Sequence, residues 1–109
     1  MANTFKLETK KNIGTVDSAV YTCPGATATT IIGMNLANTT SSAITADVTI
    51  LNNGGDSCFL VKDAPIPIGS SLVAVGGDQK VVMNAADIIK VSSSAATSID
   101  VALSILEIT

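Results

Sequence analysis

Few side chains in this sequence are suited to acid–base or nucleophilic chemistry. The 109 residues include no histidine, no arginine and no tryptophan, and all six cationic side chains are lysines. Histidine is the usual proton carrier near neutral pH, and arginine is the usual bidentate ligand for phosphate and carboxylate groups. We therefore expect no catalytic residues and no enzymatic activity.

The acidic residues could in principle bind a hard cation through their oxygen atoms. Five of them stand singly in expected turns or on solvent-facing positions: Asp56, Asp63, Asp78, Asp87 and Asp100. No two have the short alternate spacing of a calcium-binding loop. We predict turn and surface roles and no metal site within one chain, which leaves open a site assembled between subunits.

Two further patterns could suggest phosphate binding or acyl transfer. Gly76-Gly77-Asp78-Gln79-Lys80 contains the glycines of a phosphate loop, but a P-loop ends in Gly-Lys-Ser/Thr and opens a helix. This segment has neither feature and is interpreted as a hairpin turn. A serine activated by a lysine is the other pattern, but Lys62, Lys80 and Lys90 occupy polar-facing or turn positions. No cofactor-binding residue is predicted.

The two cysteines, Cys23 and Cys58, cannot form a zinc site when no histidine is present to complete it. In a reducing compartment we expect both to be small buried apolar side chains. A disulfide between them is the alternative.

The composition indicates a surface with few charges. Only 14% of the residues are charged, against about 25% in an average soluble domain. We expect part of this weakly polar surface to contact another subunit, and a monomer coated in Ser and Thr is the alternative. The net charge of −3 and the scarcity of aromatic side chains argue against nucleic-acid binding.

Membrane insertion is not expected either. No run approaches the roughly 20 apolar residues that span a bilayer. The first residues lack the basic and then apolar pattern of a signal peptide, so we expect synthesis in the cytoplasm.

Alternation with a period of two, interrupted by Gly, Pro, Asn and Ser, predicts a single all-β domain over residues 1–109. The pattern is typical of an antiparallel β-sandwich of about seven to nine strands, jelly-roll-like or immunoglobulin-like. The expected strands cover residues 4–13, 19–23, 27–38, 44–50, 57–63, 72–75, 80–83, 88–92 and 98–108.

Several local features refine this interpretation. Residues 1–13 are expected to form an edge strand of their own subunit or an arm that pairs with a neighbour. In residues 27–38, Ile32, Met34 and Leu36 are expected to share a face, and Gly33 suggests a bulge or a close backbone approach.

Other segments are read from their turns and prolines. Residues 57–63 look covered on both faces, and the two prolines of 64–69 restrict that segment to a sheet edge or a crossover. Residues 84–87 form a corner that could include one helical turn. We expect a hairpin between 72–75 and 80–83, and a terminal hairpin between 88–92 and 98–108.

Four stretches together resemble small β-sandwich virion proteins of tailed bacteriophages, particularly those of cyanobacteria. They are Val20-Tyr21-Thr22-Cys23-Pro24, the run from Ile31 to Asn38, the run from Pro65 to Leu72, and the closing run from Val101 to Glu107. The resemblance covers nearly the whole chain and rests on turn and core patterns. It implies a non-enzymatic particle component present in symmetric copies, with no catalytic residues to transfer.

The resemblance and composition give three hypotheses for the function. The leading one is a capsid decoration (cement) subunit in the virion, bridging the major capsid protein or other virion subunits, as a homo-oligomer for which a trimer is favoured. The second is a neck, tail or baseplate accessory subunit that forms a ring. The third is a host-glycan-binding module, for which only Phe5, Tyr21 and Phe59 could supply stacking surfaces.

Overall fold

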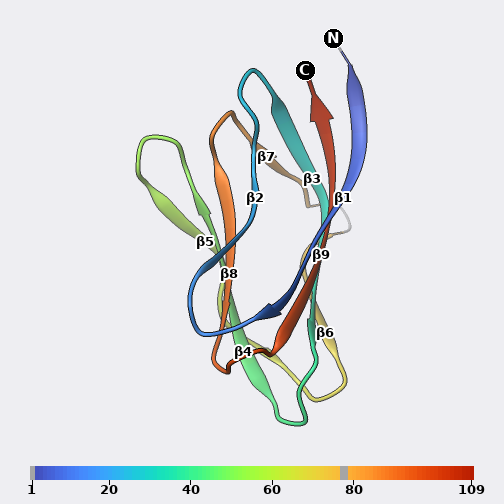
Figure 1. Ribbon diagram of the computed structural model, residues 1–109, viewed down its shortest axis with the longest axis vertical. Helices are drawn as coiled ribbons and strands as arrows, with labels where there is room; N and C mark the ends of the chain where they lie inside the picture. The colour runs from blue at the N-terminus through green and yellow to red at the C-terminus, as the bar shows by residue number, and fades with distance from the viewer. Residues whose placement is uncertain (1, 77–78) are drawn as a thin grey trace.

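The chain folds as two antiparallel β-sheets packed face to face (Figure 1). The computed structural model describes residues 2–76 and 79–109. Within these residues there are nine strands and no helix. They are β1 (Asn3–Ile13), β2 (Ser18–Thr22), β3 (Ala28–Asn38), β4 (Ile44–Leu51), β5 (Ser57–Ile66), β6 (Ser71–Val75), β7 (Val81–Met83), β8 (Ile88–Ser93) and β9 (Ile99–Ile108).

The strand order is that of a jelly roll. One sheet has the order β1-β9-β3-β6, with β7 also paired to β3, and the other has the order β2-β8-β4-β5. If β6 and β7 are taken as two parts of one edge strand, eight strands are distributed four to a sheet, and most connections cross between the sheets. The predicted all-β sandwich is confirmed, with the jelly-roll arrangement rather than the immunoglobulin one.

The core lies between the sheets and is built from the inward side chains of alternating strands. In β9, Ile99, Val101, Leu103 and Ile105 are all buried, as the alternation predicts. They pack in one cluster with inward residues of β3, β4 and β8, including Met34, Leu36, Val48, Ile89 and Val91. Because β9 is paired on both sides, it anchors the five-stranded sheet.

Gly33 marks a β-bulge, as expected. The register between β3 and β9 shifts between Ile31 and Gly33, which inserts Ile32 as an extra residue. Ile31 is therefore the buried side chain, together with Met34 and Leu36, and Ile32 is only half-buried. The expectation that Ile32 shares the inward face with Met34 is wrong. The extra residue of the bulge interrupts the alternation, so odd-numbered side chains face inward before the bulge and even-numbered side chains face inward after it.

Both expected hairpins are wrong. β6 pairs with residues 34–37 of β3 and β7 pairs with residues 29–31 of the same strand, so they follow one another along its edge. β8 belongs to the four-stranded sheet and β9 to the five-stranded sheet, and the segment between them crosses the sandwich. Alternation identifies a strand, but it does not identify the strand's partner.

β5 is an edge strand that continues to Ile66 and includes Pro65 opposite Thr45. A proline is tolerated there because no further strand needs its missing N–H group. Asp63 adopts a positive φ of 52° at an irregularity of this strand, and its N–H group donates to Asp47 Oδ1 at 2.6 Å. Phe59 is exposed, so the expectation that both faces of this strand are covered is wrong.

β1 is an edge strand of its own chain, paired to β9 from Asn3 opposite Ile108 to Ile13 opposite Ile99. Its side chains contribute almost nothing to the core before Ile13. The corner at residues 84–87 is a turn without a helix, in which the Asp87 N–H group donates to Asn84 O at 3.1 Å.

Candidate functional site

The aspartates singled out in the sequence lie apart from one another. Asp56, Asp63 and Asp100 are exposed, whereas Asp87 is buried. The two carboxylate oxygens of Asp87 accept hydrogen bonds from the backbone N–H groups of Asn53 (2.8 Å) and Asn84 (2.9 Å). Its role is to join two loops. Asp78 lies outside the described residues, and in the rest of the chain no three potential metal ligands form a group.

The lysines considered for nucleophile activation are also dispersed. Lys62 Nζ lies 5.3 Å from the ring centroid of Phe59, which is a cation–π geometry on β5. Lys90 is half-buried in the middle of β8, and Lys80 is exposed just before β7. In the glycine-rich segment, the Gln79 N–H group donates to Gly76 O at 3.1 Å, and residues 77–78 lie outside the described part.

The two cysteines are both free, so the alternative of a disulfide is not realised. Cys23 is buried as predicted, and its Sγ lies 3.2 Å from Thr29 Oγ1. Cys58 is exposed, which corrects the expectation that it is buried. The reason is that Cys58 lies on the edge strand β5 and lines an open hollow between this strand and β7.

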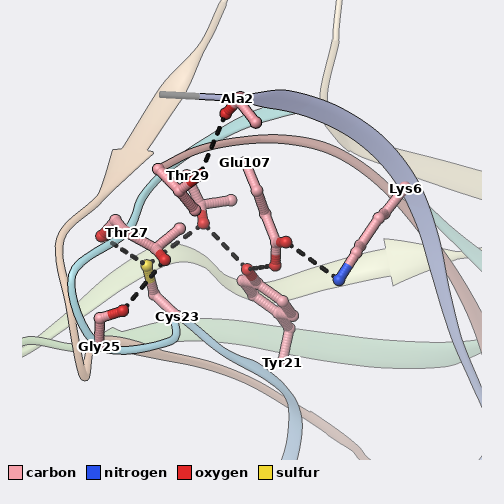
Figure 2. Close-up of polar contacts among 9 residues, drawn as sticks. Ala2, Lys6, Tyr21, Cys23, Gly25, Thr27, Thr29 and Glu107 are labelled. Atoms are coloured by element: carbon pink, nitrogen blue, oxygen red, sulfur yellow. Dashed lines mark hydrogen bonds and ion pairs between the residues drawn. The ribbon is translucent and has the colours of Figure 1, made fainter.

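A buried polar cluster joins the two sheets near one end of the sandwich (Figure 2). The Tyr21 hydroxyl on β2 donates to Glu107 Oε2 on β9 at 2.5 Å and lies 2.9 Å from Thr29 Oγ1 on β3. Lys6 Nζ on β1 lies 3.0 Å from Glu107 Oε1, and the carboxylate itself is nearly inaccessible to solvent. Lys6 of β1 and Tyr21 of β2 therefore meet at the carboxylate of β9, and Thr29 of β3 joins the cluster through the Tyr21 hydroxyl.

The electrostatics of this cluster favour a fixed protonation state. The hydrogen bond from Tyr21 and the ion pair with Lys6 lower the pKa of Glu107 below its ordinary range. Burial and the hydrogen bond to Glu107 raise the pKa of Tyr21 above its ordinary value. The carboxylate stays charged and the phenol stays neutral over a wide pH range, so the cluster stabilises the fold and is poorly suited to proton transfer.

The sequence reasoning missed Glu107. Its position offered a signal, because Glu107 continues the alternation of Ile99, Val101, Leu103 and Ile105. A glutamate in the inward phase of a core strand must be buried and must find partners.

The outer face of the five-stranded sheet presents apolar side chains to solvent. Phe5 (74% exposed) and Leu7 (62%) lie on β1, Val73 (64%) lies on β6, and Val82 (63%) lies on β7. The strand register places all four on the side opposite to the core, with half-buried Leu106 of β9 among them. We call this surface the outer face.

Charged residues line one end of the outer face. A shallow hollow of about 530 Å³ lies there, where the small side chains of Ala37 and Ala102 leave space between their neighbours. Lys10, Lys11 and Asp100 also line this hollow. The outward surface of the four-stranded sheet is less apolar at its centre. Its two central strands carry charged residues there, Asp47 on β4 and Lys90 on β8.

A second hollow of about 380 Å³ lies between the open edges of the two sheets. Its lining includes Cys58, Asp56 and Asp87 together with Val81 and Leu60. Both oxygens of the Asp87 carboxylate already accept hydrogen bonds from backbone N–H groups. This carboxylate is therefore poorly placed to act as a base for the Cys58 thiol in the same hollow.

Among the described residues, no helix is long and apolar enough to cross a membrane. No protein-family model matches the sequence, and no curated protein matches it significantly.

Proposed function

We propose that this chain is a non-enzymatic structural subunit of a tailed-phage virion, and that it acts as a capsid decoration (cement) subunit. The observation that carries the proposal is the outer face, where four large apolar side chains stand more than 60% exposed on one sheet. Two of them lie on each edge of the sheet, with half-buried Leu106 between them. Monomeric soluble proteins rarely expose large apolar patches, and such patches usually contact other proteins.

Two further considerations support the same class of protein. The resemblance to small β-sandwich virion proteins implies a particle component without catalytic residues. The jelly-roll strand order agrees by analogy, because viral capsid domains often use this architecture, although fold alone does not determine function. In this role the major capsid protein or other virion subunits are the partners.

The positions of the aromatic side chains make glycan binding the weakest of the three hypotheses. Sugar sites usually present aromatic faces to solvent, and Tyr21 is buried with its hydroxyl bound to Glu107. Phe5 and Phe59 are exposed on different sheets and cannot form one stacking platform.

The test is the copy number and position of the chain in purified virions, measured by quantitative mass spectrometry and electron cryomicroscopy. A decoration subunit is expected at hundreds of copies on the head, with particles less stable in its absence. A copy number of about a dozen or fewer, with density confined to the neck or tail, would reject decoration and select a ring-forming accessory subunit.

A further inference from the structure

We propose that the outer face binds the same face of a second copy of this chain, so that the protein pairs as a two-fold dimer. The proposal names a second copy as the partner of the outer face, so that contacts of the dimer with the capsid would use other surfaces. It rests on the proposed function only in treating the outer face as a protein–protein contact. It does not depend on where in a virion the protein resides.

The register divides the outer face into five rows that run across the strands, and three of them lie between the end rows of Ile108 and of Asp100. The large row consists of Phe5, Leu106, Thr30 and Val82, and the middle row contains Leu7, Ser104 and Gly33. The small row consists of Thr9, Ala102, Asn35 and Val73. The hollow lies at the small row, because Ala102 is shorter than its neighbours. Along β1 and β9, one half of the face is raised and the other half is recessed, whereas Val73 projects at the β6 end of the small row.

This arrangement is complementary to itself under one particular two-fold rotation. An axis in the plane of the face, perpendicular to the strands and passing through the middle row, places the large row of each copy against the small row of the other. Leu106 then faces Ala102, Phe5 faces Thr9, and Leu7 meets its own counterpart at the axis. Alternating large and small side chains in this way allows two layers to interdigitate.

Other symmetries fit the face less well. An axis parallel to the strands would set Phe5 against Val82 and leave the two recessed halves facing each other. Because the raised and recessed halves lie on a single face, a contact of this kind is isologous and closes with two copies. It therefore favours a dimer rather than the trimer expected from the sequence.

The size and charge of the face suit such a contact. Four strands about 4.8 Å apart and about ten residues long cover a rectangle of roughly 19 by 33 Å, or about 600 Å². Projecting side chains make the true surface area larger than this flat area. Stable interfaces bury about 800 Å² on each partner, which is of the same order. The residues named in the three rows are uncharged. Asp100 and Lys11 stand at the end of the face and Lys80 stands at its edge just before β7, where a polar rim is expected.

The mass of the purified chain in solution tests the proposal. By sedimentation equilibrium at micromolar concentration, we expect twice the chain mass of 11.0 kDa. Leu7→Glu should raise the dissociation constant of the dimer by at least about tenfold, because two carboxylates would meet at the axis. Thr22→Glu is the matched control, since Thr22 is exposed on the other sheet, and it should leave the mass unchanged.

Two further variants test the orientation. Ala102→Leu fills the recessed half and should also weaken the dimer, whereas Leu7→Cys in a Cys58→Ser background should be cross-linked by a bismaleimide spanning about 10 Å, the usual distance between packed sheets. Circular dichroism of each variant confirms that the fold is intact. A wild-type mass of one or three chains, or a Leu7→Glu variant that remains a dimer, would overturn the proposal. The virion copy number has no influence on these measurements.

Discussion

Tyr21 of one sheet and Glu107 of the other are joined by a hydrogen bond of 2.5 Å through the interior of the sandwich. Most contacts between the sheets are apolar and non-directional. This bond instead fixes the position of one sheet against the other at a defined point, and Lys6 extends the link to the edge strand β1.

The first prediction concerns the donor of this bond. Tyr21→Phe removes the hydroxyl and leaves both Glu107 and Thr29 without one partner, so we expect a loss of about 1–3 kcal/mol in the free energy of unfolding. Urea denaturation measures it. Thr22→Val, the exposed neighbour on the same strand, is the control and should change the free energy by less than about 0.5 kcal/mol. Equal effects of the two variants would contradict the structural role of the hydroxyl.

The second prediction concerns acid stability. Because the fold lowers the pKa of Glu107, the ionised carboxylate contributes stability that is complete above its unfolded pKa and is lost as the pH falls through its folded pKa. Glu107→Gln does not titrate, so its free energy of unfolding should be lower at neutral pH and should fall less steeply on acidification.

Denaturation curves collected at several pH values below neutrality measure this difference. Glu8→Gln is a suitable control, because it removes a carboxylate outside the cluster. If Glu107→Gln and the wild type lose stability in parallel as the pH falls, the lowered pKa of Glu107 does not contribute to folding.

The third prediction concerns the cysteines. Cys58 is exposed and Cys23 is buried beside Thr29, so a thiol reagent should modify one thiol rapidly in the folded protein and both in denaturant. Cys58→Ser should abolish the rapid reaction. Rapid modification of both thiols in the folded wild type would show that the region around Cys23 opens readily.

The fourth prediction concerns the core strand β9. Leu103 is completely buried in this strand, so Leu103→Ala should leave a cavity and cost about 2–5 kcal/mol of stability. Val16→Ala, in an exposed connection, should cost less than about 0.5 kcal/mol. Thermal and urea unfolding of the two variants compare these costs directly.

The sequence predicted those features of the fold that depend on residues close together in the chain. The alternation from Ile99 to Ile105 specified a half-buried strand, and Gly33 specified a bulge, because each is a property of neighbouring residues. The two wrong hairpins have the opposite origin. Which strand lies beside β8 or β6 depends on how distant segments share a core, and residues adjacent in the chain do not reveal it.

The candidate surface was predictable only in part. A low fraction of charged residues indicated a surface suited to contacts, but its location required the register of four strands. Phe5 and Leu7 look like core residues by composition, and they face solvent because β1 pairs with β9 with these side chains opposite Leu106 and Ser104. The exposure of Cys58 likewise follows from the edge position of β5.

The pairing of Asn3 with Ile108 has a consequence for biosynthesis. β9 follows the other eight strands in the sequence and lies between β1 and β3 in the sheet. The five-stranded sheet therefore cannot be completed before β9 has been synthesised. We expect the pairing of β1 with β9, which closes a loop of more than 80 residues, to be a slow step in folding.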